Sequence, residues 1–147
     1  MVRILADTNV LLREIDRGHE QYGLSRGSVR KILERGDTLC VTSQNLIEFW
    51  AVCTRPVSTN GLGLRPDQAD RALSRVEATV VRLSEETSSV YLEWRRLVTG
   101  CRVSGKKCHD ARLVAAMIVH NITCILTFNV QDFERYPGIT PIHPATV

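Results

Sequence analysis

The sequence predicts a three-layer α/β/α domain built around a central, mainly parallel sheet. Two observations support this prediction: short, almost wholly apolar runs recur along the chain, and segments with helical periodicity separate them. A strand that is a continuous apolar run is typical of a parallel sheet whose crossover helices cover both faces. The length of 147 residues fits one such domain, so we expect residues 1–147 to form a single domain.

Five segments are candidate strands: residues 2–6, 38–42, 79–83, 123–127 and 139–143. The segment 79–83 has the weakest strand pattern of the five. Pro141 interrupts the last segment and favours a strand at the sheet edge, because proline lacks the N–H that a central strand donates.

Six segments between or beside these runs have apolar residues at helical spacing. They lie at residues 10–15, 29–33, 46–53, 66–76, 90–98 and 111–118. Pro66 begins the fourth segment and suits a first helical turn. The clearest amphipathic pattern belongs to the last segment, with apolar residues at positions 111, 114, 115 and 118.

Composition and charge exclude several classes of protein. The chain is 44% hydrophobic and 24% charged, which is typical of a globular domain and not of a disordered chain. Its longest apolar stretch, residues 113–119, is too short to span a bilayer. Asp7 interrupts the apolar N-terminal run before a signal peptide could form. We therefore expect a cytoplasmic protein without membrane contact, while the net charge of +3 does not by itself indicate nucleic-acid binding.

The cysteines favour reduced, structural thiols. Five is an odd number, and no C-x-x-C spacing is present. Cys108 and His109 are adjacent potential zinc ligands, but no second Cys/His pair lies at ligand spacing. The sequence therefore does not predict a zinc site.

Carboxylate and amide side chains follow the predicted strands or begin the predicted helices. Their positions are Asp7 after the first strand, Glu48 in the helix after the second, Asp110 at the start of the last helix, and Asn129 and Asp132 after the strand at 123–127. Each has an ordinary structural interpretation as a helix cap, a helix-edge acid or a turn residue. These separate interpretations do not predict that all of the side chains lie at one edge of the sheet, where ligands bind in parallel α/β folds.

Several carboxylates gathered without a positive charge repel one another, so such a cluster indicates a divalent cation. Oxygen ligands alone suit the hard ions Mg²⁺ and Mn²⁺. The chemistry that follows is activation of water and stabilisation of charge on a phosphodiester.

The chain resembles the PIN-domain ribonucleases, and among them the toxin half of VapBC-type toxin–antitoxin pairs. Four motifs support the resemblance, and their order and spacing span nearly the whole chain: LADTNVL at 5–11, TSQNLIEFW at 42–50, HDARLVAA at 109–116 and TFNVQDF at 127–133. The resemblance implies the parallel α/β/α fold and a Mg²⁺- or Mn²⁺-dependent endoribonuclease. It also implies homodimerisation and an antitoxin protein as partner.

The resemblance implies roles for individual residues as well. Catalytic acids and metal ligands map onto Asp7, Glu48 and Asp110, while Asn9 and Thr127 are supporting groups, Thr127 as a hydrogen-bond donor to Asp7. A fourth position, often Asp in the family, aligns with Asn129 and leaves Asp132 as the nearest acid; we expect both to belong to the catalytic set. Asparagine in place of aspartate at position 129 removes one negative charge from the pocket, and this puts the binding of a second metal ion in doubt.

Arginine outnumbers lysine sixteen to three, which favours bidentate contacts to phosphate. Lys106 and Lys107 stand just before Asp110, and Arg112 just after it. These three basic residues are the candidates for binding the RNA backbone. The other arginine runs are typical of a solvated surface.

Three alternatives share parts of this pattern. A housekeeping PIN nuclease uses the same chemistry and differs in its substrate. A catalytically weakened PIN module that binds RNA or a protein partner is compatible with Asn129. A metal-dependent phosphatase-like domain also places Asp at the end of the first strand, but its pattern requires a second Asp two residues later, where this chain has Asn9.

Overall fold

A parallel five-stranded sheet forms the centre of the molecule, with the strand order β3-β2-β1-β4-β5. The strands are β1 (Arg3–Ala6), β2 (Thr38–Val41), β3 (Val81–Arg82), β4 (Cys124–Leu126) and β5 (Thr140–Ile142). This computed structural model describes residues 1–84 and 88–147. It confirms the parallel sheet and each predicted strand, and Pro141 lies on the edge strand β5, as predicted.

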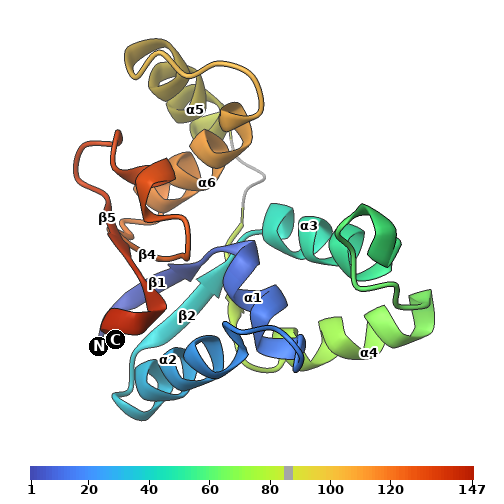
Figure 1. Cartoon of the computed structure of the whole chain (residues 1–147). Helices are drawn as coiled ribbons and strands as arrows, with labels where there is room; N and C mark the ends of the chain where they lie inside the picture. Colours follow the sequence, from blue (N-terminus) through green and yellow to red (C-terminus); the bar gives the residue numbers. More distant parts are fainter. Residues whose placement is uncertain (85–87) are drawn as a thin grey trace.

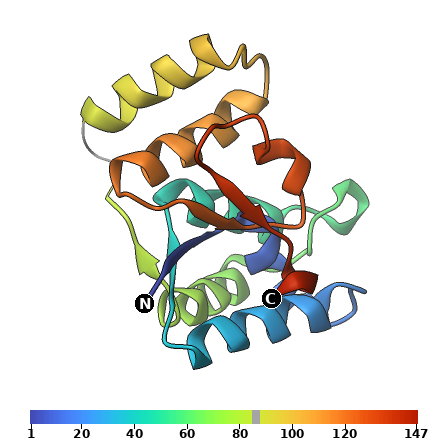
Figure 2. The ribbon, with the colours of Figure 1, turned by 90° about the vertical axis from the view of Figure 1, so that its left-hand side faces the viewer.

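Helices cover both faces of the sheet, as Figures 1 and 2 show. The helices are α1 (Thr8–Ile15), α2 (Tyr22–Glu34), α3 (Ser43–Thr54), α4 (Pro66–Glu77), α5 (Ser88–Gly100) and α6 (Lys107–Val119). Helices α5 and α6 pack together on one face, and α1 to α4 lie on the other. The predicted α/β/α layering is therefore confirmed. Within the described residues, no helix is long and apolar enough to cross a membrane.

The side chains of the central strand β1 alternate between two apolar cores. Ile4 and Ala6 belong to the core beneath α1 to α4, whereas Leu5 belongs to the core beneath α5 and α6. All three side chains are buried. The two-sided burial explains why this strand is a continuous apolar run rather than an alternating one.

The cysteines are free thiols, as predicted. Cys40 and Cys53 are buried in opposite cores, where they pack as small apolar side chains. Burial raises the pKa of the Cys53 thiol to about 11, so this thiol stays protonated near neutral pH.

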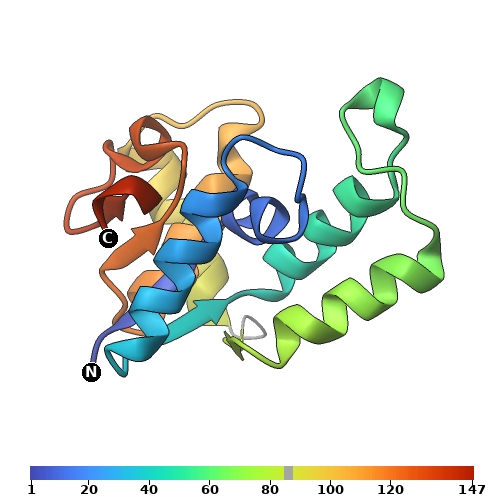
Figure 3. The ribbon, with the colours of Figure 1, turned by 60° about the horizontal axis from the view of Figure 1, so that its bottom comes forward.

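The segment that follows α3 folds back onto that helix and projects away from the sheet (Figure 3). It contains a short 3₁₀ turn, η1 (Val57–Thr59), and its Leu62 N–H donates to the Val52 carbonyl at 3.0 Å. Gly61 packs so closely that a Cβ atom there would lie 2.0 Å from the Arg55 carbonyl oxygen. Only glycine fits this turn, which holds the projecting segment against α3.

The topology places three strand ends at one edge of the sheet. Strand β1 is central, with β2 on one side and β4 on the other. Because these strands are parallel, the residues that directly follow them lie at the same edge. Asp7, Thr42 and Thr127 are these residues, and they begin the candidate site.

Candidate active site

Asp7 lies at the carboxyl end of β1 and is the N-cap of α1. Its Oδ1 accepts a hydrogen bond from the Thr8 backbone N–H at 2.8 Å, and its Oδ2 accepts one from Thr127 Oγ1 at 2.8 Å. The residue is only 9% exposed. The capping role and the expected hydrogen bond from Thr127 are thus both present, so the cap does not exclude a further role for this carboxylate.

Burial raises the pKa of Asp7 from 3.8 to about 6. Desolvation is the largest cause, and the hydrogen bonds from Thr127 and Thr8 oppose it. The negative charges of Asp110 and Glu48 raise the pKa of Asp7 further. Asp7 is therefore a carboxylate whose ionised form a nearby cation would stabilise.

The hydroxyl of Thr127 is oriented by its other hydrogen-bond partners. Thr127 Oγ1 accepts from the Asn129 backbone N–H at 3.0 Å and from Asn9 Nδ2 at 3.4 Å. A hydroxyl has one proton and two acceptor sites, so these bonds leave the proton for Asp7. Asn9 also accepts from the Phe128 backbone N–H at 3.3 Å, which ties α1 to the segment after β4.

Replacing Thr127 with valine is expected to raise the pKa of Asp7 further, because the buried Oδ2 atom loses its hydroxyl donor. Cleavage of RNA that requires ionised Asp7 should then begin at a higher pH than in the wild type. Thr127→Ser keeps the hydroxyl and should keep the wild-type profile. Initial rates measured between pH 5 and pH 9 check this, and coincident profiles for the valine variant and the wild type would rule out the hydroxyl effect.

Glu48 receives one hydrogen bond on each carboxylate oxygen. Thr8 Oγ1 donates to Oε2 at 3.0 Å, and Gln44 Nε2 donates to Oε1 at 3.0 Å. Asn45 Nδ2 in turn donates to Thr8 Oγ1 at 3.1 Å. Glu48 is therefore held by α1 and by its own helix, in contrast to an unconstrained helix-edge acid.

Gln44 joins α3 to the beginning of α6. Its Nε2 also donates to the His109 carbonyl at 2.9 Å, and its Oε1 accepts from Arg112 Nη1 at 3.1 Å. The Gln44 residue is only 8% exposed. The contact fixes Glu48 relative to α6 and gives Arg112, a predicted RNA contact, a structural partner within the protein.

Asp110 lies in the first turn of α6 and is half-buried. Burial raises the pKa of Asp110, and the negative charges of Asp132 and Glu48 act in the same direction. The positive charge of Lys107 lowers the pKa of Asp110. The carboxylates predicted to converge therefore influence one another across three different segments of the chain.

Asp132 lies in the 3₁₀ turn η2 (Val130–Phe133), where its Oδ1 forms an ion pair with Lys107 Nζ. Lys106, which precedes α6, is exposed, and its side chain forms no hydrogen bond or ion pair with any residue in the described ranges. The two adjacent lysines, both predicted to bind RNA, thus have different surroundings.

Thr8, Gln44 and Asn45 are site residues that the sequence analysis did not identify. Two local signals could have indicated them. Thr42 and Asn45 form the capping box of α3, a pattern readable at three-residue spacing. Gln44 and Glu48 are four residues apart, so they share a helix face.

The donor set fits a hydrated divalent ion. Among residues 1–84 and 88–147, no group of three or more His, Cys, Asp or Glu side chains is gathered closely enough to hold a metal ion by itself. Mg²⁺ usually keeps several waters and takes only one or two carboxylates. Asp7 and Asp110, whose pKa values are raised by burial and by neighbouring negative charges, could supply these two ligands.

The cavities differ in their relation to these acids. An open pocket of about 520 Å³ is lined by residues 128–132 directly after β4 and includes Asp132. A larger groove of about 630 Å³ lies along α2 and is lined by none of the predicted site residues. Of these two cavities, the smaller one belongs to the candidate site, because Asn129 and Asp132 line it.

The fold and the acidic site define a PIN domain. Residues 4–139 match the PIN domain family, and the chain belongs to that family. It is similar to ribonuclease VapC44 from Mycobacterium tuberculosis, with 29% identity over 99% of this chain and 100% of that protein. Membership of the PIN domain family excludes the alternative that the chain is a metal-dependent phosphatase-like domain.

Solved structures share this fold at low sequence identity. VapBC2 from Rickettsia felis, bound to a promoter DNA fragment, has a TM-score of 0.70 and 17% identity, covering 97% of this chain and 98% of that chain. VapC20 from Mycobacterium tuberculosis, a Sarcin-Ricin loop cleaving toxin, has a TM-score of 0.59 and 19% identity, covering 83% of this chain and 86% of that chain.

Proposed function

We propose that this protein is a metal-dependent endoribonuclease of the VapC toxin type that hydrolyses phosphodiester bonds in RNA. The observation that most supports the proposal is the convergence of Asp7, Glu48 and Asp110, whose negative charges act on one another at the carboxyl edge of the sheet. The ribonuclease name of the relative VapC44 supports the same activity.

Asp7 and Asp110 would hold a Mg²⁺ or Mn²⁺ ion. When bound, such an ion activates water and stabilises the charge that develops on the phosphodiester. Thr127 keeps the Oδ2 of Asp7 oriented through its hydroxyl proton. Glu48, with one donor on each oxygen, retains lone pairs that can orient a water molecule.

Basic side chains at and after the start of α6 would bind the RNA backbone. Lys106 is exposed directly before α6, and Arg112 lies on α6 two residues after Asp110. A guanidinium can contact two phosphate oxygens at once, whereas an ammonium acts as a point charge. The open pocket lined by residues 128–132 would give the RNA strand room beside Asp132.

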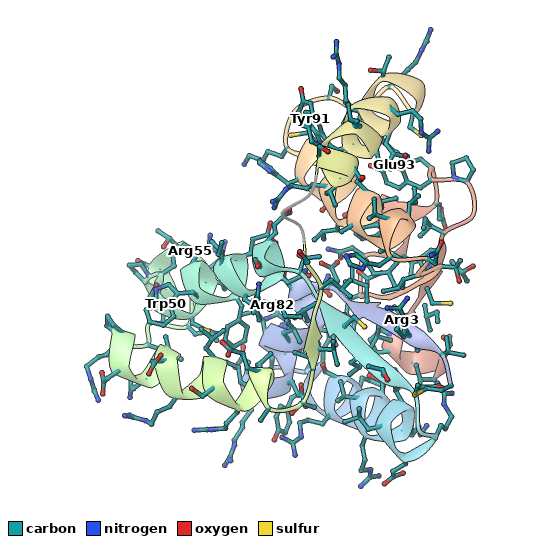
Figure 4. The ribbon with its side chains drawn as sticks, turned by 180° about the vertical axis from the view of Figure 1, so that it is seen from behind. Arg3, Trp50, Arg55, Arg82, Tyr91 and Glu93 are labelled. Atoms are coloured by element: carbon teal, nitrogen blue, oxygen red, sulfur yellow. The ribbon has the colours of Figure 1, made fainter. Side chains whose placement is uncertain are left out.

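Two protein partners belong to this proposal: an antitoxin and a second copy of this chain. The similarity to structures of VapBC complexes supports the first. Exposed apolar side chains offer surface for protein contacts; among them are Ile47, Val57, Tyr91 and Leu92. Figure 4 shows Tyr91 on α5 and Trp50 on α3, with Arg55 directly after the end of α3.

RNA cleavage with and without metal tests the proposed function. We expect the purified protein to cut a structured RNA when Mn²⁺ is present and to leave it intact in EDTA. RNA that is bound but never cut would favour the weakened binding module instead. Cleavage combined with harmless overproduction in cells would favour a housekeeping nuclease over a toxin.

A further inference from the structure

The acidic site includes a positive charge supplied by the protein itself. Lys107, the first residue of α6, extends its Nζ to Oδ1 of Asp132 in η2. The two side chains are 44% and 31% exposed, so the ion pair is partly buried beside the open pocket. Asp132 is the only carboxylate in the segment 127–133 that follows β4.

The charge of Lys107 reaches a second carboxylate. Lys107 and Asp110 are three residues apart in α6, so their side chains lie on the same face of the helix. At this spacing the positive charge of Lys107 acts on Asp110 as well as on Asp132, because Coulomb interactions are strongest at short distance. The ammonium group therefore compensates the negative charge of the side of the site formed by Asp110 and Asp132.

On the opposite side of the site, the hydrogen bonds to the acids among residues 1–84 and 88–147 come from neutral donors. Asp7 accepts from the Thr8 backbone N–H and from the Thr127 hydroxyl. Glu48 is contacted by neutral donors, the Thr8 hydroxyl and the Gln44 amide. Asn129, which begins the segment after Thr127, adds no charge. The need for a cation is therefore greatest around Asp7.

We propose that Lys107 is a resident cation of this site, that its ammonium takes the place of a second metal ion, and that the protein therefore binds a single divalent ion. A two-metal site holds its ions roughly 3.5–4 Å apart between shared carboxylates. A second ion on the Asp132 side would have to displace Lys107 or tolerate its positive charge. This inference rests on the proposed function, because it concerns the ion that the nuclease uses.

The number of Mn²⁺ ions bound by the metal-free, full-length protein tests the inference. Isothermal titration with MnCl₂ should show one ion bound to the wild type. Lys107→Met removes the charge at similar side-chain length, and this variant should bind a second Mn²⁺ ion. The Kd of that second ion should be at least about tenfold lower than the Kd of any second ion bound to the wild type. Lys107→Gln should behave like Lys107→Met, which guards against a defect specific to one variant.

Two control variants separate the local charge from general effects. Lys106→Met changes the net charge of the protein equally but removes no ion pair, and it should bind one ion. Lys107→Arg keeps the charge and should also bind one. The inference would be overturned if the wild type bound two ions. It would also be overturned if Lys107→Met and Lys107→Gln were both folded and each bound one ion. A wild type that cuts RNA and binds two ions would keep the proposed function and lose this inference.

Discussion

Asp7→Asn is expected to lower the rate of RNA cleavage by about a thousandfold or more while leaving the protein folded. The substitution replaces a charged metal ligand with a neutral amide of nearly the same shape. Asparagine caps a helix as well as aspartate does, so α1 should keep its N-terminus. The effect should therefore fall on catalysis and not on the fold.

Initial rates of cleavage in Mn²⁺ measure this effect, and circular dichroism verifies the fold. Asp110→Asn should cause a loss of similar size, because Asp110 is the second proposed ligand. Asp70→Asn is a matched control, since Asp70 is an exposed acid on α4, and it should cleave at the wild-type rate. Equal rates for the Asp7 variant and the wild type would show that the activity arises elsewhere.

In the absence of metal, the protein is expected to lose stability as the pH rises from about 4 to about 6, by about 3 kcal/mol from Asp7 alone. The pKa of Asp7 is about 6 in the folded protein and 3.8 as its ordinary value. The folded state thus binds the proton more tightly than the unfolded chain does. The stabilisation is fully present below the lower pKa and is lost as the pH passes the higher one.

Denaturation in urea at several pH values, with EDTA present, measures this loss. Asp7→Asn cannot titrate, so the free energy of unfolding of the wild type should fall relative to that of the variant across this window. Mn²⁺ at about 100 times its Kd should add about 2.7 kcal/mol to the wild type at pH 7 and little to the variant. Parallel pH dependences for the two proteins would contradict a burial-induced shift at Asp7.

The sheet could be predicted because each strand except the weakest has a distinct apolar pattern. The segment 79–83 has the weakest strand pattern of the five, and only Val81–Arg82 pairs as β3. The strand lies at the sheet edge and both of its side chains are exposed, so its sequence needs little apolar periodicity. The predicted strands extend one or two residues beyond the observed ones, and single backbone hydrogen bonds continue there, such as the one from the Thr127 N–H to the Ile142 carbonyl.

The acids of the site could be predicted because strand ends and helix starts are readable from local pattern. Their hydrogen-bond partners could not, because those contacts depend on how helices pack. Gln44 meets the carbonyl of His109 across 65 positions of the chain, and Lys107 meets Asp132 across 25. The position of Lys107 beside Asp110 predicts an RNA contact, whereas its ion pair with Asp132 in η2 depends on the packing of α6 and has no local sequence signal.

Anomalous diffraction from crystals grown with Mn²⁺ tests the central claim most directly, namely that the acids at the carboxyl edge of the sheet bind a divalent ion. We predict an anomalous peak within coordination distance of the carboxylates of both Asp7 and Asp110. Crystals that contain Mn²⁺ but show no anomalous density at these two carboxylates would contradict this account.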